Sequence, residues 1–422
     1  MRLTRRELFA GAAAALPLLG KKAAPRPSIL LITVEDLGSW MLGCYGNQEI
    51  RTPNIDILAR SGTRFQNSFA CTPEPAPSRM TLLTGRTPRQ LGPAASWPKA
   101  PMLSDALDAT GYVCGWAGEW ELGEAAAAER RFKFAALARG GDTANALKFL
   151  DSQKPGQPFF LVVNHTLSNE VAKKYADMYS SVRFEKIGWE TPRADAVRAN
   201  DALKDVVPII RSVAAAVTEF DDEIPPLLKK LDERGLRDQT VVILTATNGQ
   251  LLGRHGRWGN GAGTDPVNFW DETIGVPLIW HQLGHIPPES YRPEFASTYD
   301  LVPALCDFTG TPLPGGAPAP SSEKKIFRQP GFPGATYLHA VLNTPLPKKR
   351  PWDNQVYGES GNALMTRDKR YKLVLRDGGK GPNELYDMVG DPREHTNQFA
   401  NPQYVSVREP MAKDLETWAK TF

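Results

Sequence analysis

Three continuous apolar runs of strand length constrain the fold of this chain more than any other feature. They lie at 28–34 (SILLITV), 158–164 (PFFLVVN) and 240–247 (TVVILTAT). A strand that is apolar on both sides is typical of a parallel sheet whose two faces are covered by helices. The sequence therefore predicts an α/β domain built as a three-layer sandwich, with a mostly parallel central sheet between two helical layers.

Helical segments are expected between these strands. A Thr-Pro pair opens the segment 52–62, where threonine can cap the helix and proline can take its first position. A second helix is predicted over 77–85. A third covers about 201–235, and the prolines Pro225 and Pro226 should break or kink it.

The last quarter of the chain has a different character. Residues 310–336 are rich in proline and glycine, which is typical of a linker. After them, 365–377 (MTRDKRYKLVLRD) and 383–388 (NELYDM) alternate apolar and polar residues, as half-exposed antiparallel strands do. We therefore predict an α/β domain over 26–320 and a small C-terminal α+β domain with an antiparallel sheet over 321–422.

The N-terminus is expected to be an export signal. Residues 1–25 (MRLTRRELFAGAAAALPLLGKKAAP) place Arg5 and Arg6 before a short apolar run, which resembles a twin-arginine signal. An amphipathic or disordered N-terminal tail is the alternative. The apolar run is shorter than the roughly 20 residues that span a bilayer, so no transmembrane helix is expected in the mature chain. The prediction is a periplasmic or extracellular protein.

Charge and cysteine usage argue against two classes of function, nucleic-acid binding and zinc binding. The formal net charge is +3 over 422 residues, which gives no support for nucleic-acid binding. The cysteines form no CxxC pair, so a zinc site is not expected. Small buried hydrophobic residues are favoured over disulfides for all of them. They are Cys44, Cys71, Cys114 and Cys306.

A series of local motifs, in order along the chain, carries a resemblance. The motifs are EDLG after the first strand, then GCYGN, TPNIDILARSGTRFQNSFA, PSRMTLLTGR, GYVCGWAGEWELG, DQTVVILTATNG, LGRHGRWGNG, IGVPLIW, DLVPALCDFTG and ELYDMVGDPREHTNQ. Together they resemble the sulfatase family of the alkaline phosphatase superfamily, from about residue 28 to the C-terminus. The resemblance implies the fold predicted above and a sulfuric ester hydrolase as the parent activity.

The resemblance also implies a nucleophile that this chain lacks. In the family, Cys or Ser of a C/S-x-P-x-R motif is oxidised to formylglycine, whose hydrate attacks sulfur. Pro77 and Arg79 fit the end of that motif, but the nucleophile position is Pro75. Proline has no thiol or hydroxyl, so no formylglycine is expected. Cys71 begins another C-x-P, yet its spacing is wrong for the role.

The metal-binding positions implied by the family are also altered. Calcium takes six to eight oxygen ligands, several of them charged. Here the first pair is Glu35-Asp36, and the later Asp-Asn pair has become Thr247-Asn248. Threonine supplies a neutral hydroxyl in place of a carboxylate, so calcium binding is expected to be weak or lost. The alternative for Glu35-Asp36 is a pair of solvated acids at the end of a strand.

The basic side chains implied by the family are replaced as well. A lysine and a histidine of the family have become Glu119 and Glu121, and a second lysine has become Asn260. Exchanging two cations for two anions shifts the charge of the pocket by about four units, at roughly 1–4 kcal/mol per close pair. Arg79 is then expected to neutralise Glu119 or Glu121. His165 is out of register for a catalytic histidine and is expected to be a packed side chain.

These losses favour a sulfatase-fold pseudoenzyme with a binding or scaffold role outside the cytoplasm. Its ligand is unknown, with a sulfated or other carbohydrate as the expected class. Two alternatives stay open. One is an active sulfatase that uses unconventional residues, and the other is a hydrolase of different chemistry with Glu119 and Glu121 as acid and base.

Overall fold

The computed structural model describes most of the chain. The described residues are 26–137, 142–154, 156–168, 170–185, 187, 190, 207–322, 324, 327–345, 352 and 354–422. The expected export signal at 1–25 lies outside them. Across the described part of the chain, every helix is too short or too polar to cross a bilayer.

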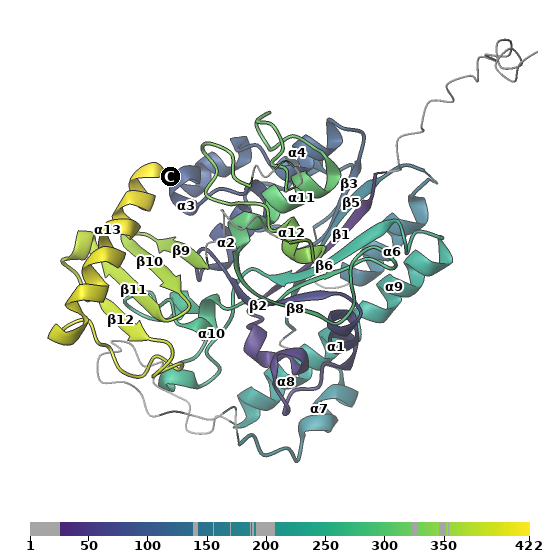
Figure 1. Cartoon of the computed structure of the whole chain (residues 1–422). Coiled ribbons are helices and arrows are strands. Elements are labelled where there is room, and N and C mark those ends of the chain that lie inside the picture. The colour runs from purple at the N-terminus through teal and green to yellow at the C-terminus, as the bar shows by residue number, and fades with distance from the viewer. Residues whose placement is uncertain are drawn as a thin grey trace, which may run out of the picture.

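An eight-stranded central sheet organises the larger part of the molecule (Figure 1). Its order is β4-β3-β5-β1-β6-β7-β2-β8, and every neighbouring pair is parallel except the two pairs made by β7. The three apolar runs form the adjacent strands β5, β1 and β6, which confirms the predicted mostly parallel sheet. The strands are β1 Ser28–Glu35, β2 Thr63–Phe69, β3 Val113–Gly118, β4 Phe134–Ala136, β5 Phe159–Thr166, β6 Thr240–Ala246, β7 Leu278–His281 and β8 Ser290–Ser297.

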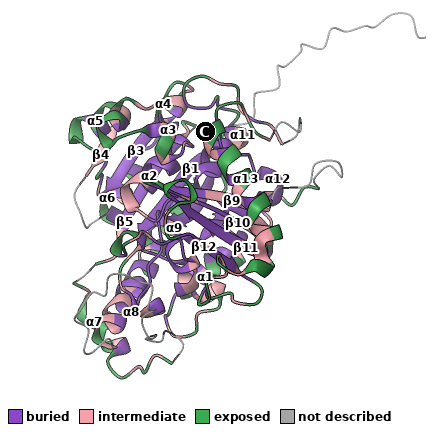
Figure 2. Cartoon of the chain, turned by 90° about the vertical axis from the view of Figure 1, so that its left-hand side faces the viewer, coloured by how far each residue is buried: buried purple, intermediate pink, exposed green. Residues whose placement is uncertain are grey.

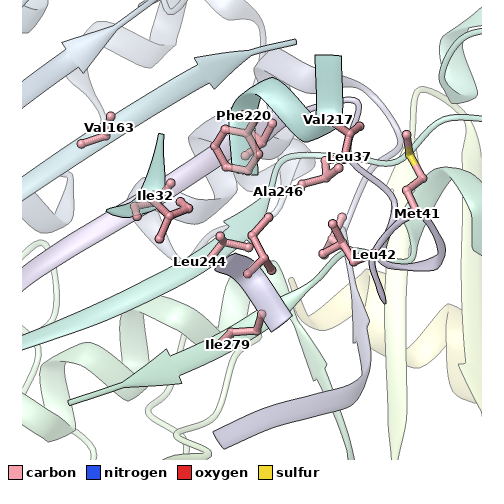
Figure 3. Packing of buried hydrophobic residues seen from close by; sticks show 14 of the residues in the cluster. Ile32, Leu37, Met41, Leu42, Val163, Val217, Phe220, Leu244, Ala246 and Ile279 are labelled. Atoms are coloured by element: carbon pink, nitrogen blue, oxygen red, sulfur yellow. The ribbon is translucent and has the colours of Figure 1, made fainter. Parts of the chain in front are cut away.

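One helical layer covers the face of the sheet that receives Leu30, Ile32 and Val34 of β1. Figure 3 shows this core, where Ile32 and Leu244 lie near Phe220 of α8. Because side chains alternate along a strand, β1 supplies every second residue to this layer. The helices of this layer are α1 Pro53–Arg60, α6 Asp142–Ser152, α7 Lys173–Tyr179, α8 Val207–Asp221 and α9 Ile224–Glu233.

A second helical layer covers the opposite face, which receives Ile29 and Leu31 of β1. The two hydrophobic cores therefore lie on the two sides of one sheet, and the predicted three-layer sandwich is confirmed. The helices of this layer are α2 Pro75–Thr84, α3 Pro88–Leu91, α4 Leu103–Asp108, α5 Ala125–Arg131, α11 Leu301–Thr309 and α12 Leu338–Val341.

One predicted helix boundary differs from the structure, and one predicted helix break is confirmed. The helix expected from Pro77 begins at Pro75, two residues earlier. Both prolines fit the first turn because the N–H groups there have no partner within the helix. The long helical stretch expected over 201–235 is broken beside its prolines, as predicted. It forms two helices, α8 and α9, with both prolines in the first turn of α9, and its residues 201–206 lie outside the described part.

The C-terminal part forms a separate four-stranded antiparallel sheet in the order β12-β11-β10-β9, as predicted. Its strands are β9 Gln355–Ser360, β10 Ala363–Asp368, β11 Tyr371–Arg376 and β12 Glu384–Asp387. Helix α13, Val405–Thr421, packs Leu415 and Trp418 on this sheet, and the Trp418 ring stacks on Tyr357 with centroids 4.9 Å apart. Figure 2 shows the strands as buried and much of α13 as exposed.

Buried ion pairs connect this second sheet to the central domain through α10, Asp271–Ile274. The Nζ of Lys372 lies 2.6 Å from Asp271 Oδ1 and 2.8 Å from Glu394 Oε1, and both Lys372 and Glu394 are fully buried. Arg367 adds a contact of 2.9 Å to Asp271. Charges this deeply buried persist only when they are paired, so the four groups act as a single clamp.

The cysteines are free thiols, in line with the prediction that favoured small hydrophobic residues over disulfides. Cys71, Cys114 and Cys306 are buried, and Cys44 is partly buried. The remaining short elements are 3-10 helices. They lie at Ser39–Met41, Gly43–Tyr45, Ala94–Lys99, Arg254–Gly256, Gly261–Gly263, Thr298–Asp300, Asp377–Gly379 and Pro402–Tyr404.

Candidate functional site

The candidate site lies at the carboxyl ends of β1 and β6, where ligands bind in open α/β sheets. Glu35 is the last residue of β1, and Asp36 follows it with a positive φ of 55°. The side chain of Gln250 holds this turn by donating to the Asp36 backbone oxygen at 2.8 Å. After Asp36 the chain enters the core through Leu37, Met41 and Leu42 (Figure 3), which fixes the position of the turn.

Helix α2 brings the degenerate motif to these strand ends. Pro75 is its first residue, with Glu74 at the N-cap, so the nucleophile position is occupied by a residue that starts a helix. The hydroxyl of Ser78 donates to the Thr247 backbone oxygen at 2.5 Å, which ties α2 to the end of β6. The helix ends at Gly85, whose φ of 69° is the left-handed conformation that favours glycine.

Arg79 is the buried cation of the site. Its side chain is 1% exposed and makes an ion pair with Glu35. It also donates to the Trp120 backbone oxygen at 2.9 Å and contacts Glu121 at 3.4 Å. Burial lowers the pKa of Arg79 from its ordinary value, while Glu121 and Glu119 oppose that shift. Its positive charge is thus shared among oxygens of the protein itself.

Glu119 and Glu121 follow the end of β3, on the loop that faces Arg79. The Thr166 hydroxyl donates to Glu119 Oε2 at 3.3 Å, and Asn164 Nδ2 donates to the Glu119 backbone oxygen at 3.0 Å. The side chain of Glu121 is 44% exposed, so it forms part of the outer surface of the site. The expectation that Arg79 neutralises one of these glutamates holds for Glu121, but the sequence did not reveal its partner Glu35.

Two amide groups surround the carboxylate of Asp36. Asn248 Nδ2 donates to Asp36 Oδ1 at 2.6 Å, and Asn260 Nδ2 donates to the same oxygen at 3.1 Å. Burial raises the pKa of Asp36, while these two hydrogen bonds act to lower it. The hydroxyl of Thr247 donates to Asn248 Oδ1 at 2.8 Å, so the residue that replaces a family carboxylate binds its neighbour. Asp36, Thr247, Asn248 and Asn260 therefore form one hydrogen-bonded group.

These side chains do not fit a calcium ion. A calcium site needs oxygens that face a common centre, whereas the amide groups next to Asp36 present N–H donors. Glu35 faces Arg79, and it is buried, so the alternative of solvated acids at the strand end is wrong for Glu35. Within the described ranges, no three histidine, cysteine or acidic side chains are placed to share a metal ion.

The structure also brings together residues to which the sequence assigned no role. Arg254 and His255 contact Glu272 of α10 at 3.0 and 3.2 Å, and the His255 ring stacks on Trp270 with centroids 4.0 Å apart. Burial would raise the pKa of Glu272, but the contacts with His255 and Arg254 lower it to about 2. The motif LGRHGRWGNG contains both Arg254 and His255, so it is the sequence signal that could have indicated these two residues. Arg254 and His255 lie on the segment that leads to Asn260.

His165 is not part of the site. Its Nδ1 lies 3.3 Å from Asp142 Oδ2, and its ring packs against Phe220 with centroids 5.0 Å apart. This placement agrees with the expectation of a packed histidine. The site thus contains acids, amides and one neutralised arginine, and neither Pro75 nor any neighbour on the first turn of α2 supplies a thiol before Ser78, whose hydroxyl is already bonded.

Comparison with known proteins identifies relatives of this chain. Arylsulfatase A of Homo sapiens is 27% identical over 90% of this chain and 84% of its own length. An ulvan-active sulfatase of Formosa agariphila is 24% identical over 92% of this chain and 80% of its own length.

Solved structures share the fold of this chain. A protein solved with its substrate D-glucosamine-2-N,6-O-disulfate superposes with a TM-score of 0.76 at 19% identity, over 94% of this chain and 98% of that one. The phosphonate monoester hydrolase of Agrobacterium radiobacter gives 0.72 at 19% identity, over 94% and 96%. The family model described as sulfatase matches residues 27–141 and 142–311. This chain therefore belongs to the sulfatase family.

Proposed function

We propose that this protein is a non-catalytic member of the sulfatase family with a binding or scaffold role outside the cytoplasm. The observation that carries the proposal is Pro75, which occupies the nucleophile position and starts α2. A proline there offers no atom that can be oxidised to an aldehyde or attack sulfur. The fold is retained, and function has to be argued from the altered site.

The charges of the site support the same proposal. A sulfate ester is an anion, and Glu119 and Glu121 stand where the family places a lysine and a histidine. The buried Arg79 is already paired with Glu35 and Glu121, so its charge is not available to an incoming sulfate. Carboxylates at the outer surface repel anions. A sulfated group is therefore disfavoured at this position.

We propose a carbohydrate without a sulfate at this position as the ligand. Relatives are named as N-acetylglucosamine-6-O-sulfatase and ulvan-active sulfatase, which are names of carbohydrate-active proteins. Carboxylates and amides, such as those of Glu121 and Asn260, can hydrogen-bond sugar hydroxyls without charge repulsion. The calcium and formylglycine of the family are not part of this proposal.

The purified protein should release no sulfate from an aryl sulfate or a sulfated oligosaccharide. This result is expected with added calcium and after coexpression with a formylglycine-generating enzyme, because Pro75 gives that enzyme no side chain to oxidise. Sulfate release is measured against a buffer blank, with an active arylsulfatase as the positive control. Metal-dependent turnover that is abolished by Asp36→Ala would favour the alternative of an unconventional active sulfatase.

Reversion of single residues should be nearly silent in the same assay. Pro75→Cys restores a nucleophile, but Glu119 and Glu121 still repel sulfate and Thr247 still lacks a carboxylate. Groups that act as a unit give non-additive effects. Any gain should need the full set, Pro75→Cys, Glu119→Lys, Glu121→His, Thr247→Asp and Asn260→Lys.

Export is proposed to depend on the twin-arginine signal at 1–25. Changing Arg5 and Arg6 together to lysine should stop accumulation outside the cytoplasm, because the export receptor reads the arginine pair. Cell fractionation and immunoblotting of the two forms measure the effect. Equal amounts of both forms in the periplasmic fraction would contradict the twin-arginine assignment.

A further inference from the structure

Two hollows of the surface meet at the side chains of Trp40 and Arg254. The larger hollow has a volume of about 260 Å³ and is lined by residues of β2, α10 and the C-terminal part. The smaller hollow, of about 220 Å³, is lined by the segment 46–49. Trp40, Tyr45 and Arg254 line both hollows, which therefore form one groove, called here the Trp40 groove. The residues of the candidate site line neither hollow.

The wall shared by the two hollows is held in place by contacts within the protein. The guanidinium of Arg254 lies over the Trp40 ring, 4.1 Å from its centroid, and donates to Glu272 Oε1 at 3.0 Å. The hydroxyl of Tyr45 accepts from the Leu278 backbone N–H at 3.0 Å. A wall that is fixed before a ligand arrives loses little conformational freedom on binding.

The charged side chains around the larger hollow already have counter-charges. The ion pairs are Arg254 with Glu272, Arg393 with Glu190, and Asp271 with both Lys372 and Arg367. Opposite charges in close contact largely cancel each other's attraction for a third charge. An uncharged ligand is therefore favoured over an ion in this groove.

The larger hollow also contains uncharged polar groups that are open to a ligand. The hydroxyls of Ser39 and Ser68 and the amide of Gln66 have no hydrogen-bond partner among the residues that the structure describes. Each of these groups can both donate and accept. Trp40 is half-buried and adds aromatic surface. Aromatic surface beside a few polar groups suits a ligand that carries hydroxyls on an apolar ring, which is the chemistry of a sugar.

The size of the hollows limits what each can hold. Both are smaller than the roughly 300–1,000 Å³ of pockets for drug-sized ligands, so each suits a single ring. We propose that the Trp40 groove is a second binding site, for an uncharged oligosaccharide that places one sugar ring in each hollow. This inference goes beyond the proposed function, because it concerns other residues and holds whether or not the candidate site has activity.

The test measures the binding of uncharged sugars by isothermal titration calorimetry. The probes are the monosaccharides and tetrasaccharides of glucose, galactose, mannose and N-acetylglucosamine, with a tetrasaccharide of glucuronic acid for comparison. At least one uncharged tetrasaccharide should bind about tenfold more tightly than its monosaccharide, because the second ring binds from a high effective concentration once the first is in place. The glucuronic acid tetrasaccharide should bind no more tightly than this uncharged one.

Two glutamine variants test the two hollows separately. Gln66 lines the larger hollow and Gln48 the smaller one, and both residues are exposed, so alanine at either position should leave the fold intact. Each of Gln66→Ala and Gln48→Ala should weaken tetrasaccharide binding about fivefold, the usual effect of losing one hydrogen bond. Gln403→Ala is the matched control, because Gln403 is also exposed but lines neither hollow. Its affinity should stay within about twofold, and circular dichroism checks the fold of all three variants.

Four results would overturn the inference. The first is that none of the uncharged tetrasaccharides binds, and the second is that none binds more tightly than its monosaccharide. The third is tighter binding of the glucuronic acid tetrasaccharide than of every uncharged one, since charge would then govern recognition. The fourth is equal affinity of the Gln66, Gln48 and Gln403 variants, which would place the ligand elsewhere on the protein. Sulfate release would overturn the proposed function and leave this inference intact.

Discussion

Replacing Lys372 with alanine should lower the free energy of unfolding by about 3–5 kcal/mol, the usual cost of leaving buried charges without a partner. Lys372 is fully buried and holds Asp271 at 2.6 Å and Glu394 at 2.8 Å. Its Nζ also donates to the Phe269 backbone oxygen at 2.7 Å. Chemical denaturation followed by tryptophan fluorescence measures the loss.

The loss of unfolding free energy in Lys372→Ala should depend on pH. Burial raises the pKa of Glu394 to about 7, and the charge of Lys372 opposes this shift. The protonated carboxyl therefore stabilises the fold fully below about pH 4.5. This contribution to the free energy of unfolding is lost as the pH rises through about 7. Lys372 lowers the pKa of Glu394, so Lys372→Ala should raise that pKa further, and Glu394 is then neutral at pH 5 and needs no counter-charge. The destabilisation should therefore be smaller at pH 5 than at pH 8.

Lys173→Ala is the control for the lysine change. Lys173 contacts Asp177 at 2.5 Å, but its side chain is 86% exposed, so solvent screens the pair. Its replacement should leave the unfolding midpoint unchanged at both pH values. Equal losses for Lys372→Ala and Lys173→Ala would show that the buried clamp contributes no more than a surface pair.

Gly118→Ala should be the most damaging single methyl addition near the site, with an expected cost of about 3–5 kcal/mol from backbone strain and overpacking together. Gly118 has a φ of 116°, and a Cβ there would lie 2.0 Å from the Asn164 backbone oxygen of β5. Relief would require β3 and β5 to separate, which would also move Glu119. Thermal unfolding followed by circular dichroism measures the effect.

The variant Gly111→Ala separates backbone strain from overpacking. Gly111 has a φ of 93°, but no atom lies within 4 Å of the position of its Cβ. Its replacement should cost only the strain of the left-handed backbone, about 1–2 kcal/mol. If both variants lose the same stability, the contact with Asn164 is not the cause.

The strands of this fold follow from the sequence because their signal is local. The runs that form β1, β5 and β6 are apolar throughout, and only a sheet covered on both faces buries such strands. The start of α2 was predicted two residues too late because Pro75 and Pro77 are both compatible with a first helical turn. Sequence spacing does not decide between them.

The residues of the candidate site were predictable from the sequence, but their hydrogen-bond and ion-pair partners were not. The motifs placed Glu35, Asp36, Thr247 and Asn248 at two strand ends, where the structure finds them. The pairing of Arg79 with Glu35 depends on how closely α2 approaches β1, and no sequence pattern reports that distance. The orientation of the Asn248 amide depends on its hydrogen bond with the Thr247 hydroxyl, which no sequence pattern reports either.

The neighbouring acids of α10 imply that two distant regions open together. Asp271 holds the C-terminal sheet through Lys372 and Arg367, while Glu272 holds the loop that begins at Arg254 and leads to Asn260. A four-residue helix is too short to let one acid move without the other. We expect amide hydrogen exchange to show the strands β10 and β11 and the Asp36 turn as one cooperative unit, with the same opening free energy in both.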